Sequence, residues 1–289
     1  MAEFHQIAGY DVVATLGKGA ASTLYQVRDR DGKVYCLKRV VKKSPSEQRF
    51  IDQAICEYDI AKHFDNPLLR QVHRLIKQRA VIRTNEVLVV MEMVEGKTLE
   101  LVKLSGMSAF IKLFCAAASG LSAMHEAGFV HADIKPNNIM LTGQGHVKII
   151  DFGQSCKNGT IKERIQGTPD YIAPEQVLRR AITYQTDVFN LGATMYWMLT
   201  GSYVPTLIPK KEAGIQLKTE DHGSLRPPIE VDPTVPPALS NLVLDCVQTD
   251  PRQRPETMQA LIDRMEIAGR QAERAKVASA EASPHREAS

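Results

Sequence analysis

The sequence is poor in cysteine, and the arrangement of its cysteines argues against two common kinds of stabilisation. The five cysteines are odd in number, widely scattered and never spaced as CxxC. This spacing disfavours both a disulfide framework and a structural zinc site. The eight histidines show no HExxH or similar ligand spacing. The metal ion that such a sequence suits best is magnesium, held by carboxylate, amide and phosphate oxygens, which directs attention to nucleotide chemistry.

The chain also lacks long hydrophobic runs and an excess of charge. No apolar stretch approaches the roughly 18 to 20 residues of a membrane span, and the opening MAEFHQ lacks a secretion-signal pattern. The 36 basic and 33 acidic residues give a net charge of +3, which argues against a nucleic-acid surface or a polybasic anchor. We expect a soluble, cytoplasmic protein. Its 289 residues, 44% of them hydrophobic, suffice for one large domain or two lobes.

The first third of the chain reads as a small antiparallel sheet with one helix. Alternating hydrophobic residues predict three strands within residues 10–41, with Asp31-Gly32 supplying a hairpin turn. The hydrophobic pattern predicts a helix over residues 46–64 and two further strands after it. We therefore expect an N-terminal lobe over residues 1–94.

The rest of the chain changes to long helical stretches, of which residues 108–126 and 187–199 are the clearest. Seven of the fifteen prolines fall between residues 202 and 237, a composition that favours irregular structure there. We expect a larger, mostly helical lobe over residues 95–268. Residues 269–289 hold almost no large apolar side chain, so a disordered or frayed-helical tail is expected.

A glycine-rich turn, Gly17-Lys18-Gly19-Ala20-Ala21-Ser22, is the first chemical signal. Small residues let backbone N–H groups approach a phosphate. A dinucleotide-binding fold would need a helix directly after the glycines, yet Thr23, Tyr25 and Val27 alternate as in a strand. A hairpin over phosphates fits better, although an ordinary glycine turn between two strands would look the same.

One cation and one carboxylate stand out because hydrophobic residues surround them. Lys38 ends a hydrophobic strand, and Glu57 lies mid-helix among Ile51, Ile55 and Ile60. An unpaired carboxylate there would be costly to desolvate. We expect Lys38 to pair with Glu57, which would hold the lysine against phosphate oxygens, although each residue alone is more commonly a solvated charge.

The most specific stretches are His131-Ala132-Asp133-Ile134-Lys135-Pro136-Asn137-Asn138 and, shortly after it, Asp151-Phe152-Gly153. Together with the glycine turn, Lys38, Glu57 and Ala173-Pro174-Glu175, they resemble the signature set of the eukaryotic-type protein kinases. The segments follow in the family's order and at its spacing.

The resemblance covers about residues 10–266 and implies an α+β, bilobal protein-kinase fold. A small antiparallel sheet with one main helix would form the first lobe, and mostly helices the second. Lys135 at its position resembles the serine/threonine branch, and Gln176 after the Ala-Pro-Glu segment looks like bacterial members. The resemblance implies an enzyme that uses ATP and Mg²⁺ to phosphorylate serine and threonine hydroxyls of proteins, and itself as well.

The resemblance also implies a role for each polar residue of the signature. Asp151 would chelate the magnesium ion that bridges the phosphates, and Asn138 would bind a second ion. Asp133 would accept or orient the proton of the attacking hydroxyl. Lys135 would neutralise the transferring phosphoryl group. The alternative, loop carboxylates that only cap helices, is disfavoured by the whole set.

Adenine recognition is implied at the segment that joins the two lobes. Main-chain groups of Glu92 and Val94 would bind the base, and Met91 would occupy the gatekeeper position, although plain core packing gives the same residue types. The expected ATP-binding residues are Leu16, Gly17, Lys18, Gly19, Leu24, Cys36, Lys38, Glu57, Met91, Glu92, Val94, Asn138, Met140 and Asp151.

The segment before Glu175 resembles the part of the family that supports a peptide substrate, with Thr168 poised near Asp133 and Lys135. Glu175 is expected to pair with Arg254. Asp187 is expected to brace the backbone of the catalytic loop. We expect structural rather than catalytic roles for these partners.

Ala132 departs from the family, which usually carries an arginine there that binds a phosphate on the activation loop. We therefore hypothesise that Ser155 and Thr160 can be phosphorylated without this being required for activity.

Two alternatives stay open at this point. A pseudokinase would keep the fold without turnover, but the residues of the signature are all present. A small-molecule phosphotransferase of kinase-like shape would generally lack the Ala-Pro-Glu segment and its arginine partner. Nothing supports a nucleic-acid module, and a regulatory partner or a dimer is left undecided by the sequence.

Overall fold

The structure is a computed structural model that describes residues 6–281 apart from residues 20, 81–82 and 209–224. The chain divides into two compact units, which are described one at a time. Unit 1 comprises Met1–Lys97 and Met140–Ser155, and unit 2 comprises Thr98–Ile139 and Cys156–Ser289. The sequence placed residues 140–155 in the second lobe, because a boundary drawn along the chain cannot show a segment that returns to the first unit.

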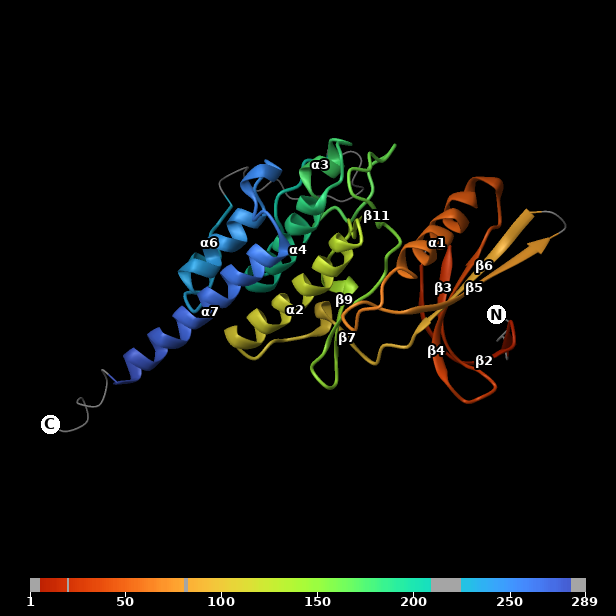
Figure 1. Ribbon diagram of the computed structural model, residues 1–289, viewed down its shortest axis with the longest axis horizontal. Coiled ribbons are helices and arrows are strands. Elements are labelled where there is room, and N and C mark those ends of the chain that lie inside the picture. Colours follow the sequence, from red (N-terminus) through yellow and green to blue (C-terminus); the bar gives the residue numbers. More distant parts are fainter. Residues whose placement is uncertain (1–5, 20, 81–82, 209–224, 282–289) are drawn as a thin grey trace. The chain divides into compact units, whose positions relative to one another are not determined.

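Unit 1 is built on a six-stranded antiparallel sheet (Figure 1). A hairpin joins β2 to β3 through the glycine turn, and β4 and β6 pair over seven residue positions. The strands, in their order across the sheet, are β1 (Gln6–Ile7), β2 (Tyr10–Lys18), β3 (Ser22–Arg28), β4 (Val34–Val41), β6 (Arg83–Glu92) and β5 (Val72–Ala80).

The main helix of unit 1, α1 (Gln48–Ala61), packs on one face of this sheet after a short turn, η1 (Pro45–Glu47). The helix pattern expected over residues 46–64 is therefore one 3-10 turn and one α-helix. Because side chains alternate along a strand, the sheet has two apolar faces. The α1 face gathers Val40, Ile51 and Val89, and the opposite face has its own buried cluster around Leu37.

Backbone hydrogen bonds attach the returning segment 140–155 to unit 1. Ile149 donates its N–H to the Leu68 carbonyl at 2.7 Å, and Arg70 donates to the Ile149 carbonyl at 2.9 Å. Three short strands, β10 (Val147–Ile149), β9 (Ile139–Thr142) and β7 (Gly96–Thr98), form a small separate sheet.

Unit 2 is mostly helical (Figure 1). Four longer helices carry its core, in which Phe114, Leu121, Leu191 and Leu261 are fully buried. The helices are α2 (Met107–Glu126), α4 (Tyr184–Thr200), α6 (Pro237–Cys246) and α7 (Met258–Glu281). The short elements are η2 (Leu99–Leu101), β8 (Phe129–Val130), η3 (Pro136–Asn138), β11 (Cys156–Lys157), α3 (Pro174–Val177), α5 (Pro228–Val231) and η4 (Pro251–Gln253).

Together, an antiparallel sheet with one main helix and a mostly helical second unit confirm the expected α+β class. Within the proline-rich stretch, the four-residue helix α5 forms, and residues 209–224 lie outside the described part. Residues 269–281 of the expected tail continue α7, and residues 282–289 are not described.

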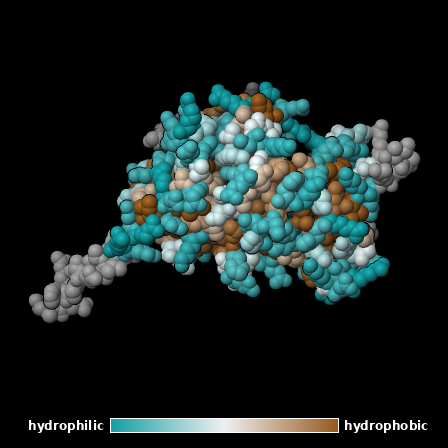
Figure 2. Space-filling model, in the orientation of Figure 1, coloured by the Kyte–Doolittle hydropathy of each residue, from teal (hydrophilic) through white to brown (hydrophobic). Residues whose placement is uncertain are grey.

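Helix α2 is long and apolar enough, by length and composition alone, to cross a membrane. Half of its most apolar window is buried inside the structure, and the core helix of a globular domain passes the same test. The helix therefore carries no argument for a membrane span. Hydrophobic and hydrophilic residues are interspersed on the face drawn in Figure 2, which is ordinary for a protein surface.

The core of unit 2 can be tested at Phe114, whose side chain is fully buried in α2. Phe114→Ala is expected to lower the free energy of unfolding by about 3–5 kcal/mol, because it loses apolar contact and leaves a cavity. The matched control is Leu101→Ala, since Leu101 is 70% exposed. Trp197, the single tryptophan, lies in α4, so its fluorescence during urea denaturation reports this unit. Equal midpoints for the two variants would contradict the assignment of this core.

Candidate active site

Lys38 and Glu57 form a buried ion pair in unit 1. The Lys38 Nζ lies 2.6 Å from the Glu57 Oε2, and the Glu57 side chain is 1% exposed. β4 supplies the lysine and α1 the glutamate, so the pair joins the helix to the sheet. Burial disfavours the charged Lys38 ammonium, but the carboxylates of Glu57 and Asp151 outweigh this effect and raise the lysine pKa. The pairing expected from the sequence is present.

Asp151 brings a second carboxylate to this lysine. Its Oδ1 lies 3.8 Å from the Lys38 Nζ, and its side chain is 46% exposed. The residue has a φ of +66°, in the left-handed region that aspartate tolerates better than most residues. The next residue, Phe152, is buried, and the centroid of its ring lies 5.6 Å from that of the Phe64 ring. The Gln53 Nε2 donates a hydrogen bond to the Gly153 carbonyl at 2.9 Å. These contacts hold the Asp151 carboxylate beside Lys38.

The glycine turn is a hairpin, as the alternation after it predicted. Gly17 pairs with Leu24, Lys18 pairs with Thr23, and the Gly19 N–H donates to the Ser22 carbonyl at 2.8 Å. A Cβ atom at Gly19 would lie 2.9 Å from the Ser22 Oγ, so a larger residue would have to displace that side chain. Ala20 lies outside the described residues.

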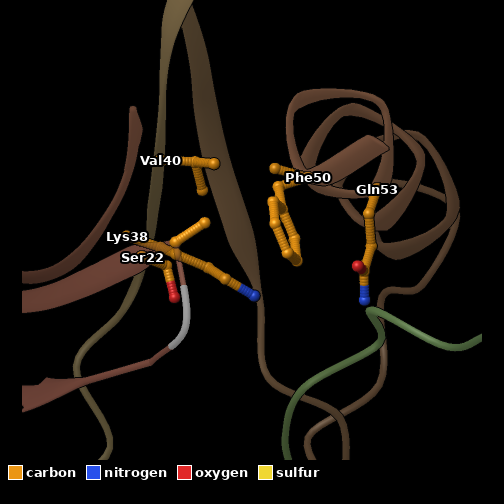
Figure 3. A pocket seen from close by; sticks show the side chains of 7 residues that line it. Ser22, Lys38, Val40, Phe50 and Gln53 are labelled. Atoms are coloured by element: carbon orange, nitrogen blue, oxygen red, sulfur yellow. The ribbon is translucent and has the colours of Figure 1, made fainter. Parts of the chain in front are cut away.

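A pocket of about 170 Å³ opens inside unit 1 between this hairpin and α1 (Figure 3). Ser22 and Lys38 line it from β3 and β4, and Phe50 and Gln53 line it from the helix. The Lys38 side chain points across the pocket toward α1. The amine that pairs with Glu57 therefore also faces an open space next to the glycine turn.

The expected adenine-binding residues of unit 1 differ in their surroundings, and three of them share one apolar cluster. Leu24, Cys36 and Met91 belong to one apolar cluster, which agrees with both an adenine pocket and core packing. Val94 follows β6, outside any strand, and no hydrogen bond from its backbone to the described residues is present. Of the others, Leu16 is 45% exposed, Met140 is half-buried in β9, and the Glu92 carboxylate pairs with Lys148 at 2.8 Å.

Unit 2 brings together Asp133, Lys135 and Thr168. The Thr168 hydroxyl donates to the Asp133 Oδ1 at 2.9 Å. The Lys135 Nζ lies 3.0 Å from the Asp133 Oδ2 and 2.6 Å from the Thr168 Oγ1. Asp133 is 9% exposed, so one carboxylate is held in a fixed direction with a cation and a hydroxyl against it.

Asn138 is buried next to this group, and its Nδ2 donates to the Asp133 carbonyl at 2.8 Å. Because the amide nitrogen serves as the donor, the amide oxygen is the atom that suits a cation. Asn138 thus offers an amide oxygen and Asp151 a half-exposed carboxylate, which are the oxygen ligands that Mg²⁺ prefers. Each of the two donor types fits a magnesium ion. The described residues hold no cluster of three or more His, Cys, Asp or Glu that suits a metal ion.

Asp187 holds the backbone of the catalytic loop, residues 131–138, from the interior of unit 2. Its two carboxylate oxygens accept the backbone N–H of His131 at 2.9 Å and of Ala132 at 2.8 Å. The His125 Nε2 lies 2.8 Å from the Asp187 Oδ2. The Asp187 side chain is fully buried, and these contacts replace the water that a carboxylate otherwise binds.

Glu175 and Arg254 form a second buried ion pair, at 2.8 and 2.9 Å. The Arg254 side chain is fully buried, and it also donates to the carbonyls of Gln185 and Gln248. The Thr186 hydroxyl donates to the Glu175 Oε1 at 2.8 Å. The structure thus contains the pair that the sequence indicated, and both charges have further partners.

Two hydroxyl residues of the activation segment differ in their exposure. Ser155 is buried, with 6% of its surface exposed. Thr160 is half-buried, its hydroxyl donates to the Lys157 carbonyl at 2.7 Å, and its backbone pairs with Ile182. Thr160 is therefore the more accessible of the two proposed phosphorylation sites.

Sequence reasoning missed three polar residues that support the site, namely Gln53, Gln176 and Asn190. The sequence indicated for Gln176 only a resemblance to bacterial members of the family and no role in the site. A signal for Asn190 was present in α4, where polar residues recur at positions 186, 187, 190 and 194 of an otherwise apolar helix. All four are buried and therefore need partners.

Comparison with known proteins identifies the family. Residues 10–264 match the protein kinase domain family, and the chain belongs to this family. Membership implies ATP as the phosphoryl donor and, in general, a divalent metal ion.

Three of the similar proteins are bacterial and are named as serine/threonine-protein kinases. A probable serine/threonine-protein kinase of Clostridium perfringens is 27% identical over 266 residues, which cover 89% of this chain and 38% of the relative. Another, of Clostridium acetobutylicum, is 28% identical and covers 89% of this chain and 39% of the relative. Serine/threonine-protein kinase PknD of Chlamydia muridarum is 27% identical over 304 residues, which cover 87% of this chain and 30% of the relative.

This chain therefore spans no more than about two fifths of the length of these relatives. The family match and the relatives' names confirm the expected membership among the serine/threonine protein kinases.

The buried pair in unit 2 predicts a large effect of removing one partner. Arg254→Met is expected to lower the free energy of unfolding by about 3–5 kcal/mol, because it leaves the Glu175 carboxylate buried without its cation. The matched control is Arg264→Met, which breaks the exposed pair of Arg264 with Asp245 and is expected to cost less than about 1 kcal/mol. Urea denaturation followed by Trp197 fluorescence measures both. A similar loss in the two variants would show that burial of the pair has no special weight.

Proposed function

We propose that this chain transfers the γ-phosphoryl group of ATP to serine and threonine hydroxyls of proteins in a magnesium-dependent reaction, and that it also phosphorylates itself. The observation that carries the proposal is the pairing of Lys38 with the buried Glu57, with the Asp151 carboxylate 3.8 Å from the same lysine. A buried cation aimed at a pocket beside a glycine turn is suited to neutralise the phosphates of a bound nucleotide.

In this proposal, the residues of unit 1 hold the nucleotide. Lys38 binds phosphate oxygens, and Glu57 fixes the direction of its side chain. Asp151 would hold a magnesium ion, which neutralises phosphate charge when it is bound. The glycine turn allows its backbone N–H groups to approach the phosphates. The apolar cluster around Cys36 and Met91 takes the adenine ring.

Unit 2 supplies the groups that act on the acceptor hydroxyl. Asp133 accepts the proton of that hydroxyl, and the hydrogen bond that its carboxylate accepts from the Thr168 hydroxyl supports this role. Lys135 neutralises charge on the transferring phosphoryl group. Asn138 would bind a magnesium ion through its amide oxygen. Positioning and charge neutralisation, rather than covalent help, are what this reaction requires of a protein.

Two alternatives make different predictions. A pseudokinase would bind nucleotide without turnover, and the complete set of polar residues argues against it. A small-molecule phosphotransferase would not need the segment anchored by Glu175 and Arg254, which supports a peptide in the proposed function. A cytoplasmic location and a regulatory partner or dimer stay predictions.

Incorporation of radiolabelled phosphate from ATP into a generic protein substrate tests the proposal. Asp133→Ala is expected to lower the rate by about 10²- to 10⁴-fold, because it removes the proton acceptor. Asp151→Ala is expected to be at least as harmful and, in addition, to weaken magnesium-dependent nucleotide binding. The control Asp263→Ala removes an exposed carboxylate from α7 and should leave the rate unchanged. Wild-type protein that binds ATP without transfer would favour a pseudokinase, and unchanged rates in both site variants would refute the assigned roles.

A second experiment concerns the activation segment. A variant with Ser155→Ala and Thr160→Ala is expected to retain most of the activity, because Ala132 offers no cation to bind a phosphate on this segment. Mass spectrometry of the wild-type protein after incubation with ATP shows whether either residue is modified. Loss of nearly all activity in the double variant would mean that phosphorylation is required.

A further inference from the structure

The backbone of Ala132, directly before Asp133, is held by side chains at both its N–H and its carbonyl. The Ala132 N–H donates to the Asp187 Oδ1 at 2.8 Å, and the Ala132 carbonyl accepts a hydrogen bond from the Gln176 Nε2 at 2.9 Å. Ala132 has a φ of +61°, which is an uncommon conformation for a residue with a Cβ atom. A strained residue at this position persists only when its surroundings hold it.

Gln176 uses the whole hydrogen-bonding capacity of its amide. Its Nε2 donates to the carbonyls of Ala132, at 2.9 Å, and Gln166, at 3.2 Å. Its Oε1 accepts the Ala173 N–H at 3.0 Å and the Asn190 Nδ2 at 3.2 Å. The side chain is 3% exposed, so water does not replace any of these partners. A side-chain amide has two N–H donors on its nitrogen and two lone pairs on its oxygen, both attached to the same carbon, so it can fill these four positions.

The four partners belong to three segments of unit 2. Ala132 is in the catalytic loop, and Asn190 is on α4. Gln166 directly precedes the substrate-supporting segment, residues 167–175, and Ala173 lies near its end. Asp187 and Asn190 are three residues apart and therefore share a face of α4. One face of a helix thus holds the Ala132 peptide directly through Asp187 and indirectly through Gln176.

We propose that Gln176 is a positioning residue that fixes the direction of Asp133 and the course of the substrate-supporting segment through neutral hydrogen bonds. The family usually carries an arginine at position 132, which binds a phosphate on the activation loop. Because Ala132 offers no cation, the hydrogen bonds of Gln176 link the catalytic loop to the substrate-supporting segment without a phosphate. The role in catalysis rests on the function proposed above, whereas the ordering of the two segments does not.

The sharpest variant is Gln176→Glu, which keeps the shape of the side chain. A carboxylate only accepts hydrogen bonds, so it would face the carbonyls of Ala132 and Gln166 without a proton to donate. The matched control is Gln185→Glu. Gln185 lies in the same unit and donates its Nε2 to the Glu256 carbonyl at 2.7 Å, and among the described residues its side chain forms no hydrogen bond with the catalytic loop. Both variants lose the same kind of bond and gain the same charge.

Steady-state kinetics separate positioning from general damage. Gln176→Glu is expected to lower kcat by about 10- to 100-fold, because small displacements of a reacting group have effects of this size. The KM for ATP should stay within about twofold of wild type, since none of the four hydrogen bonds of Gln176 goes to a residue proposed to bind ATP. The control Gln185→Glu should match wild type in both constants. An unchanged kcat for Gln176→Glu would overturn the catalytic role. A lower kcat accompanied by a higher KM for ATP would overturn it as well.

Hydrogen exchange measured by mass spectrometry tests the ordering without any need for activity. In Gln176→Glu, amides of residues 129–138 and 164–173 should exchange faster, while those of α6 and the first half of α7 should not change. Wild-type exchange throughout would refute the proposal, and faster exchange everywhere would show a general loss of stability instead. If wild type transfers no phosphate but the local effect is found, the proposed function fails and the ordering role stands. Should Gln176→Glu fail to fold, Asn190→Ala is expected to give the same local pattern at smaller size, because it removes one of the four bonds of Gln176 together with the bond from the Asn190 Nδ2 to the Tyr171 carbonyl.

Discussion

A charge that is removed from water must be paired, and this constraint determines the position of each functional group in the structure. In unit 1, Glu57 is buried in α1 and has Lys38 as its cation, so the lysine cannot leave the pocket beside the glycine turn without stranding a carboxylate. In unit 2, the Asp187 carboxylate is satisfied by backbone N–H groups of the catalytic loop, and Glu175 is satisfied by Arg254. The polar groups that support catalysis are thus held by the same interactions that make their burial tolerable.

These interactions also explain how a flexible peptide segment acquires a defined course. Asp133 owes its direction to the backbone of the preceding residue, Ala132, whose N–H is held from α4 by Asp187 and whose carbonyl is held from α3 by Gln176. The segment between Gln166 and Ala173 is attached to the same amide. The amide of Gln176 has all four of its hydrogen-bonding positions filled, and this favours one arrangement because any partial rearrangement would leave a buried polar group without a partner. Permanent ordering is consistent with the alanine that stands where relatives in the family usually carry an arginine.

Much of this arrangement was predictable from the sequence, because it follows local patterns. The hairpin at the glycine turn follows from strand alternation, and the pair of Lys38 with Glu57 follows from a charge in an apolar strand and another in an apolar helix. The return of residues 140–155 to unit 1 was not predictable, since it depends on backbone hydrogen bonds with residues about 80 positions earlier. The role of Gln176 was also missed. Its partners are backbone groups and one asparagine, and an interaction with a backbone carbonyl leaves no trace in the identity of the residue that provides it.

The most direct test of the account is a double-mutant cycle on Lys38 and Glu57, with kcat/KM for ATP measured for wild type, Lys38→Met, Glu57→Gln and the double variant. If Glu57 acts by holding Lys38, the double variant will be no slower than Lys38→Met alone, because the glutamate has nothing left to position. Losses that add on the free-energy scale, so that the double variant is slower than Lys38→Met by the full effect of Glu57→Gln, would show that the two residues act independently and would contradict the account.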